Sequence, residues 1–570
     1  MGGGASKTSS GAMAAPSPAG PPAKGLTPQK KAASPSVAIV YYSTYGHIKA
    51  LADEIKAGLE AAGVNVDLFQ VPETLPAEVL KAMSAPEKPD DVMLLDYDFL
   101  KELPNYDGFM FGMPTRFGMM AGQMKTFFDS TGQLWASGAL AGKLAATFVS
   151  TGTQQGGQET THFTAVTQLV HHGMAYVPLG YQAGGEGQFD LSEIHGGSPW
   201  GASTLAGADG SRQPSAKELA IAKKQGQVFG ATVAQSTSTP AERELKVCIV
   251  YYSLYGHVKK LADEIAASMR EEGVTVDLFQ APELLGPEVL EKMGAPPKPE
   301  DPVMDYAAVS KLAEYDGIMF GLPTRFGSAS AQMKSFFDST GALWQSGALA
   351  GKLAASFVST GTLNGGQEST HMTTLTNMVH HGMIYVPLGY QAGGDGQFDM
   401  TEIHGGSPWG ASTYAGADGS RQPSAMEMSI AKRQGKVFAA KDKLVRIWKF
   451  PEGDLLGECK GHRRGVWCVA FSPIDQVVAS ASGDATVRLW NLKDFRAIRS
   501  FQGHSSAVLR VAFLANGMQL MSSSVDGLLK LWHIRTAECA ATFEEHTSKV
   551  WCILVTQWYP LPFLWFWVPF

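Results

Sequence analysis

The stretch VAIVYYSTYGHIKALADEI, residues 37–55, decides the fold predicted for the first part of this 570-residue chain. It opens with a short apolar run, Val37 to Tyr42, that is typical of a buried strand in a parallel sheet. After a polar loop, apolar residues recur at helical spacing as far as Leu59. Further apolar runs that we expect to be strands lie at residues 64–69, 108–112 and 144–150. This alternation predicts an α/β fold in which helices cover both faces of a parallel sheet.

The same pattern occurs twice along the chain. The tripeptide YYS at 41–43 recurs 210 residues later, and PTRFG at 114–118 recurs 209 residues later. Each unit is roughly 200 residues long, which is too long for a solenoid repeat, so we expect two whole doubly wound domains. The predicted parts are a disordered tail at 1–36, domains at 37–230 and 246–440, and a polar linker at 231–245.

A second period, of 42 residues, begins after residue 440. It separates three aspartates, three tryptophans and three histidines: Asp442, Asp484, Asp526, Trp448, Trp490, Trp532, His462, His504 and His546. This region, 441–553, resembles the WD-repeat propellers of transducin-β-like proteins. The resemblance implies short antiparallel strands in which these residues are structural. Only two complete periods are present, whereas closed propellers have four to eight blades. The region, with the atypical apolar tail at 554–570, is either the product of a gene-model or transcript fusion or a docking module for a protein partner.

Composition excludes several classes of function. The formal net charge of −7 argues against nucleic-acid binding, which needs a basic surface. The five cysteines form no C-x-x-C pair, so we expect a reduced, cytoplasmic protein. No run of 18 apolar residues and no secretory signal is present. The first residues fit a myristoylation pattern at Gly2, although a glycine-rich tail can match it by chance. One acyl chain would give only weak peripheral contact with a membrane.

The loop Ser43 to Ile48 lies between the first predicted strand and helix. Its hydroxyls and the free N–H groups of the helix N-terminus could hold a phosphate, or the loop could be a simple Ser/Thr helix cap. It matches neither the Rossmann fingerprint nor the Walker loop. Two further loops, Pro114 to Gly118 and Ser150 to Gly157, should meet it, because ligands of doubly wound sheets bind at the carboxyl ends of the strands.

Two features of this part, an arginine and a pair of histidines, have alternative interpretations. Arg116 could place positive charge beside a flat heterocycle bound between these loops, or it could form a surface ion pair. The pair His171-His172 could suggest a metal site, but adjacent side chains diverge and no ligand stands at suitable spacing, so we predict no metal. No Ser/His/Asp nucleophile site is recognisable, and we predict no catalytic side chain.

These loops and several further runs resemble the WrbA type of NAD(P)H:quinone oxidoreductase. The matching runs are YYSTYGHI at 41–48, PTRFG at 114–118, D-x-T-G-x-L-W-x-S-G-A-L-x-G-K-L at 129–144, STGT at 150–153 with the GGQE that follows, HHGM at 171–174, and DGSRQPS at 209–215. They span nearly all of 37–230 and, in the second copy, of 247–438. The resemblance implies a flavodoxin-like fold, FMN, and two-electron reduction of quinones by NADH or NADPH. It also implies tetramers whose active sites form where subunits meet.

The resemblance assigns roles to individual residues of both copies. The residues that would bind FMN in the first copy are Ser43, Thr44, Tyr45, Gly46, His47, Ile48, Thr115, Arg116, Phe117, Ser150, Thr151, Gly152, Thr153, Gly156, Gly157 and His171. Those of the second copy are Ser253, Leu254, Tyr255, Gly256, His257, Val258, Thr324, Arg325, Phe326, Ser359, Thr360, Gly361, Thr362, Gly365, Gly366 and His380. Tyr45 would contact the nicotinamide nucleotide, while Trp135 and Trp344 would cover the quinone. Leu254 replaces the hydroxyl of Thr44, and we expect the second site to survive this change.

The sequence therefore predicts an FMN-dependent NAD(P)H:quinone oxidoreductase. The alternative is an interaction or scaffold protein in which the WD-repeat region matters and the flavin domains are vestigial. Since each chain carries two copies, two chains would complete the assembly of four domains, as a dimer of tandem chains.

Overall fold

The structure is a computed structural model. It describes residues 34–544 with short interruptions at 89–92, 95–98, 182–187, 208, 238–244, 391–396, 417, 440–444, 449–454, 460–461, 463–465, 507 and 515–516. Residues 1–33 of the predicted tail with Gly2, residues 238–244 of the predicted linker, His546 and the apolar tail at 554–570 lie outside the described residues. The predictions for those segments therefore stay predictions.

The first domain contains a parallel sheet with the strand order of flavodoxin-like folds. Its strands are β1 (Ser36–Tyr41), β2 (Asn65–Gln70), β3 (Met93–Leu94), β4 (Gly108–Arg116), β5 (Met119–Met120), β6 (Leu144–Thr151), β7 (Ala175–Tyr176) and β8 (Ser203–Leu205). The order runs β3-β2-β1-β4-β6, and β7 and β8 pair in parallel with the start and the end of β6. The fifth position of the sheet is thus divided between two short strands. The carboxyl ends of β1 and β4 flank the point where the strand order reverses, which is where such folds bind ligands.

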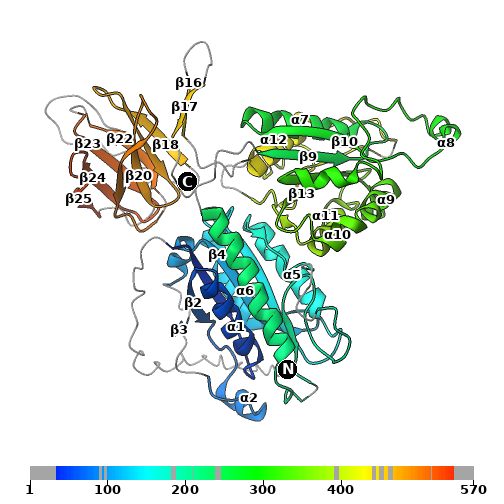
Figure 1. Ribbon diagram of the computed structural model, residues 1–570, viewed down its shortest axis with the longest axis horizontal. Helices are drawn as coiled ribbons and strands as arrows, with labels where there is room; N and C mark the ends of the chain where they lie inside the picture. The colour runs from blue at the N-terminus through cyan, green and yellow to red at the C-terminus, as the bar shows by residue number, and fades with distance from the viewer. Residues whose placement is uncertain are drawn as a thin grey trace, which may run out of the picture. The chain divides into compact units, whose positions relative to one another are not determined.

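Helices cover both faces of this sheet. They are α1 (His47–Ala61), α2 (Ala77–Ala82), the 3-10 helix η1 (Phe99–Asn105), α3 (Gly122–Ser130), α4 (Gly132–Ala136), α5 (Gln158–His171) and α6 (Ala216–Thr237). Helices α1 and α6 pack side by side on one face (Figure 1), and α3 and α5 supply the core of the other. Glycine permits the close approach of α1 and α6, because a Cβ at Gly58 would lie 2.1 Å from the carbonyl oxygen of Lys223.

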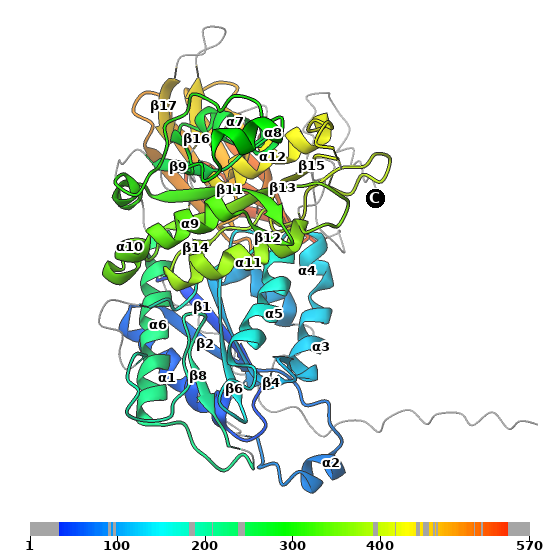
Figure 2. The same ribbon diagram turned by 90° about the vertical axis from the view of Figure 1, so that its right-hand side faces the viewer.

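The second domain repeats this architecture. Its strands are β9 (Lys246–Tyr251), β10 (Thr275–Gln280), β11 (Gly317–Arg325), β12 (Ser328–Ala329), β13 (Leu353–Thr360), β14 (Ile384–Tyr385) and β15 (Ser412–Tyr414). Its helices are α7 (His257–Glu271), α8 (Pro287–Lys292), the 3-10 helix η2 (Val309–Glu314), α9 (Ala331–Ser339), α10 (Gly341–Ser346), α11 (Gln367–His380) and α12 (Ala425–Ala439). Figure 2 shows α7 and α12 on one face of this sheet and α9, α10 and α11 on the other.

The predicted linker at 231–245 begins too early. Helix α6 continues to Thr237, through the first half of that segment. The physical reason is packing, since Phe229 and Val233 are buried in the core beneath α1 and hold this end of the helix on the sheet. The polar composition that suggests a linker marks only the exposed face of the helix here.

The two domains contact each other along the edge formed by the short strands. Tyr176 of β7 pairs antiparallel with Tyr385 of β14. Close backbone contacts flank this pair: a Cβ at Gly180 would lie 2.6 Å from Cα of Gly382, and one at Gly389 would lie 2.7 Å from Cα of Gly173. Both contacts need glycine, and they come from corresponding loops of the two copies.

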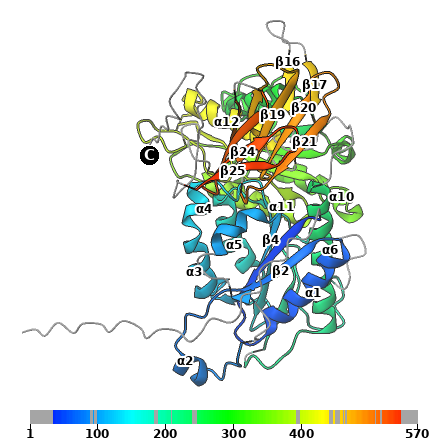
Figure 3. The ribbon, with the colours of Figure 1, turned by 90° about the vertical axis from the view of Figure 1, so that its left-hand side faces the viewer.

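The C-terminal region consists of small antiparallel sheets, as the 42-residue period predicts. A two-stranded sheet of β16 (Val445–Trp448) and β17 (Leu455–Cys459) precedes two four-stranded sheets (Figure 3). These contain β18 (Val466–Phe471), β19 (Val477–Ser482), β20 (Thr486–Asn491) and β21 (Ala497–Gln502), and then β22 (Val508–Phe513), β23 (Gln519–Ser524), β24 (Leu529–His533) and β25 (Cys539–Phe543).

The periodic residues of this region form buried hydrogen-bond chains. His462 bonds Asp484 at 2.9 Å through Nδ1 and Ser480 at 2.6 Å through Nε2, and Trp490 donates to the same serine. The next period repeats the chain with His504. The grouping of Ser, His and Asp has the composition of a catalytic triad, but its serine is fully buried, so its role is structural.

Within the part of the chain that the structure describes, no helix combines the length and the apolar character needed to cross a membrane.

Candidate functional site

The loop that follows β1 contains hydrogen-bond donors for which the described structure shows no partner. For the backbone N–H groups of residues 43–46, no hydrogen bond is recorded in the described structure, although Ser43 and Thr44 are buried. The hydroxyl of Ser43 is also buried without a partner among the described residues. These donors converge at the N-terminus of α1, where Gly46 adopts φ of +90°. A partly buried loop with several unpaired donors fits a phosphate.

The second loop follows β4 and turns sharply into the hairpin with β5. Phe117 has φ of +53° and a fully exposed side chain, which is an unfavourable combination for an aromatic residue. Strain of this kind is concentrated at ligand sites. The guanidinium of Arg116 is exposed and donates to the carbonyl of Thr115 at 2.8 Å. Arg116 is thus exposed in the loop that follows β4, and its role beside a flavin stays a prediction.

The third loop follows β6 and meets the second at a glycine. Gly157 has φ of +109°, and a Cβ at this position would lie 2.7 Å from Oγ1 of Thr115 and 3.1 Å from Cα of Gly118. Thr115 is itself hydrogen-bonded to Thr161 of α5 at 2.7 Å. The loops after β4 and β6 therefore lie in close contact with each other.

A buried carboxylate holds the DGSRQPS segment beside the first loop. Glu218 is fully buried and accepts hydrogen bonds from Arg212, from Thr204 Oγ1 and from several backbone N–H groups. The carbonyl of Arg212 in turn accepts a bond of 2.8 Å from Nε2 of His47. His47, predicted as a flavin ligand, therefore contacts protein through its ring and orients the start of α1.

Sequence reasoning missed a lysine beside the first loop. Lys88 donates to the carbonyl of Ser43 and forms an ion pair with Glu73 at 3.4 Å. Burial raises the pKa of Tyr42, which donates to the same glutamate, to about 12. Repetition in the sequence could have pointed to this lysine. The runs APEK and APPK end in Lys88 and Lys298 at matching places of the two copies.

His171 belongs to a cluster of aromatic side chains from both domains. Its ring centroid lies 5.7 Å from that of Tyr390, and Trp135 lies 6.1 Å from Tyr390 and 6.4 Å from Phe398. The structure therefore brings the predicted residues His171 and Trp135 together with two residues of the second domain that were not predicted. A corresponding cluster combines His380 and Trp344 of the second domain with the first domain's Tyr181 and Phe189.

The second copy reproduces the loops of the first. Gly256 and Gly366 have φ of +89° and +111°, and Phe326 is exposed with φ of +55°. The N–H groups of residues 253–256 likewise have no recorded hydrogen bond in the described structure. Leu254, which corresponds to Thr44 of the first copy, is buried in the apolar core. All residues assigned to the second site occupy places that correspond to those of the first.

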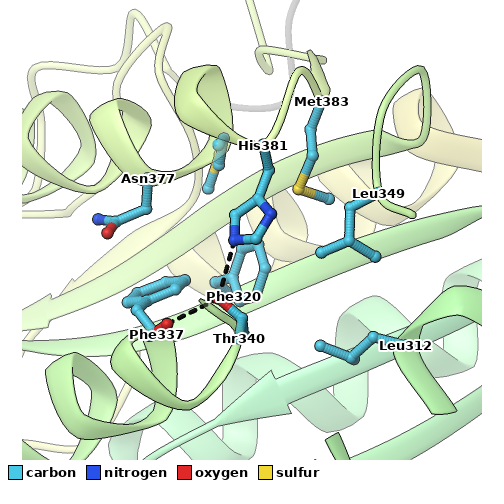
Figure 4. Close-up of a pocket in the computed structure, with 9 residues that line it drawn as sticks. Leu312, Phe320, Phe337, Thr340, Leu349, Asn377, His381 and Met383 are labelled. Carbon is cyan, nitrogen blue, oxygen red and sulfur yellow. Dashed lines mark hydrogen bonds between the residues drawn. The ribbon is translucent and has the colours of Figure 1, made fainter. Parts of the chain in front are cut away.

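The second histidine of each pair points into the core. Figure 4 shows His381 with Thr340 in a pocket that is otherwise lined by apolar side chains and Asn377. Because Thr340 donates to the carbonyl of Phe337, Nε2 of His381 must donate to Thr340, which leaves its buried Nδ1 without a partner in the described structure. Burial lowers the pKa of His381 to about 4. His172 of the first domain has the same surroundings and the same shift.

Comparison with protein families places these domains. Residues 36–188 and 245–397 each match the model of the NADPH-dependent FMN reductases. Residues 453–491 and 495–533 match the WD domain, G-beta repeat.

Individual relatives cover about one domain each. A quinone-oxidoreductase of Triphysaria versicolor is 56% identical over 202 residues, which is 35% of this chain and 97% of that protein. An NAD(P)H quinone oxidoreductase of Candida albicans is 55% identical over 201 residues, again 35% of this chain and 97% of that protein. A minor allergen of Alternaria alternata is 54% identical over 194 residues, 34% of this chain and 94% of that protein.

Proposed function

Because the chain belongs to the family of NADPH-dependent FMN reductases, which it matches twice, we propose that each of its two flavodoxin-like domains binds FMN and reduces quinones with NADH or NADPH. The observation that carries this proposal is the set of unpaired donors in the loop at 43–46, repeated at 253–256. The names of the relatives from Triphysaria and Candida support the choice of a quinone. The experiment that tests it is turnover of NADH or NADPH with a soluble quinone by the purified chain.

Different loops of the first site bind different parts of the cofactor. Ser43 to Ile48 hold the phosphate with backbone and hydroxyl donors, and Thr115 to Phe117 with Ser150 to Gly157 line the ring. Bound FMN would supply the hydride-transfer chemistry between the nicotinamide and the quinone, and a proton from solvent would complete the hydroquinone. Arg116 provides positive charge where reduction builds negative charge on the pyrimidine end. Tyr45, whose hydroxyl donates to the carbonyl of Met83, borders the approach of the nicotinamide nucleotide.

The aromatic clusters are the proposed quinone sites, and each needs both domains. Replacing Tyr390 with alanine should remove the wall opposite His171 and Trp135 and impair only the first site. We expect quinone turnover to fall to about half, because one of two sites is lost, while two FMN stay bound. Tyr181→Ala should do the same to the second site, and the double variant should retain roughly a tenth of the activity or less. Activity that is unchanged in both single variants would contradict the shared sites.

We propose that two chains pair through apolar surfaces near these clusters. Leu191 and Ile194 of the first domain are exposed, at 94% and 61%, and Met400 and Ile403 repeat them in the second. We expect a chain consisting of residues 1–440 to run as a dimer in light scattering and to carry four FMN per dimer. A monodisperse monomer with full activity would refute the dimer of tandem chains.

The exposed surface of the WD-repeat region favours a role in binding a protein partner over a role in catalysis. Val469 is 47% exposed, whereas Val511, one period later, is 4% exposed and packed in the cluster between the two sheets. The first sheet thus offers an apolar face that the second has covered. We expect deletion of residues 441–570 to leave quinone turnover and FMN content unchanged. A truncated chain that binds FMN but turns over more slowly would show that this region contributes to the reaction.

A further inference from the structure

Two lysines contact the phosphate loops of the two domains in the same way. Nζ of Lys88 donates to the backbone carbonyl of Ser43 at 2.5 Å, and Nζ of Lys298 donates to that of Ser253 at 3.2 Å. Both lysines follow a short, surface-exposed helix, α2 or α8, that buries no side chain of its own. Neither lysine belongs to the loops predicted to bind the flavin, so their shared contact needs a separate explanation.

A network of side chains fixes the position of each ammonium group. Lys88 lies 4.7 Å above the ring centroid of Tyr42 and pairs with Glu73. Glu73 also accepts hydrogen bonds of 2.9 Å from Tyr42 and from Gln123 of α3. In the second domain, Nζ of Lys298 lies 4.4 Å above the ring centroid of Tyr252 and 2.7 Å from Glu283. Gln332 donates a hydrogen bond of 3.0 Å to the same glutamate. The glutamate therefore neutralises the positive charge of each lysine. The tyrosine, the glutamate and the glutamine together fix the direction of the lysine side chain.

The consequence lies in the peptide that the lysine holds. In a trans peptide the carbonyl and the N–H point in opposite directions. With the carbonyl of Ser43 held by Lys88, the N–H of Thr44 points away from the lysine, and no partner is recorded for it in the described structure. If this peptide rotated, its carbonyl oxygen would replace that N–H and repel an anion.

We propose that Lys88 and Lys298 are positioning residues for phosphate recognition, each of which keeps one peptide N–H of its loop available to the FMN phosphate. This inference rests on the proposed function, and it adds a requirement that applies to the phosphate and not to the flavin ring. The lysines act through the backbone and do not touch the phosphate themselves.

The test compares FMN with riboflavin, which lacks the phosphate, on the full chain freed of flavin. Titration followed by quenching of flavin fluorescence gives the affinity and the number of sites. In Lys88→Met, which keeps the apolar stem, we expect FMN to bind roughly tenfold more weakly at one of two sites, with riboflavin affinity unchanged. Lys298→Met is the matched variant for the other site, and the double variant should weaken both. Lys88→Arg, which retains a donor, should restore part of the FMN affinity.

The outcomes separate this inference from the proposed function. Unchanged FMN affinity in Lys88→Met would overturn the inference, and so would an equal loss of FMN and riboflavin affinity, which would indicate a general structural role. A wild-type chain that binds neither flavin would instead refute the proposed function.

Discussion

Between pH 6.5 and pH 5, each flavodoxin-like domain should lose about 3 kcal/mol of stability through two buried histidines. Burial lowers the pKa of His162 to about 3 and that of His172 to about 4. In the unfolded chain both titrate near a pH of about 6.5, so below that pH the unfolded state binds protons that the folded state excludes. Each histidine then costs up to about 1.4 kcal/mol per pH unit as the pH falls. His371 and His381 have the same shifts in the second domain.

Urea unfolding at pH 7, 6 and 5, followed by circular dichroism, measures this loss. In His162→Gln, which can keep a hydrogen bond to Thr147, the slope of stability against pH should fall by up to about 1.4 kcal/mol per unit for the first domain. The variant His371→Gln provides the matched change in the second domain. Equal stability of the wild-type chain at pH 5 and pH 7 would show that these histidines are not kept neutral by burial.

Replacing Gly157 with valine should empty the first flavin site. The position has φ of +109°, which a β-branched residue adopts only with strain, and its Cβ would collide with Thr115 and Gly118. The loops after β4 and β6 would then separate, and both line the flavin ring in our account. We expect FMN to bind roughly a hundredfold more weakly there, so that purified chains carry one FMN in place of two.

The design has two internal controls. Gly366→Val makes the same change in the second domain, where a Cβ would lie 2.7 Å from Oγ1 of Thr324. Gly63→Val strains a glycine that also has a positive φ, of +79°, but a Cβ there would meet no atom within 4 Å. Gly63 is remote from the flavin loops, so chains with this change should retain two FMN. If Gly157→Val chains still carry two FMN at full affinity, the assignment of this loop is wrong.

Local patterns predicted most of the fold. The run 37–42 forms β1 at Ser36–Tyr41, and the helical spacing after it forms α1. These predictions succeed because a strand buried on both faces leaves a continuous apolar run, and a helix on one face leaves a stripe. The division of the fifth strand into β7 and β8 was not predicted, since each piece is too short to show a period.

The site could be predicted only where a motif is continuous in sequence. The loop at 43–48 is such a motif and was predicted. Tyr390 and Phe398 were not predicted, because they contact His171 and Trp135 only when one domain packs on the other. The role of Lys88 was also missed, since its contact with Ser43 depends on how the segment after α2 returns to the sheet.

The most direct test of the central claim is the flavin content of the purified full-length chain. The account predicts a yellow protein that releases two FMN per chain on denaturation, and whose bound flavin is bleached by NADH or NADPH and restored by a quinone. A colourless chain that takes up no FMN when it is supplied would contradict the claim that these two domains are flavin enzymes.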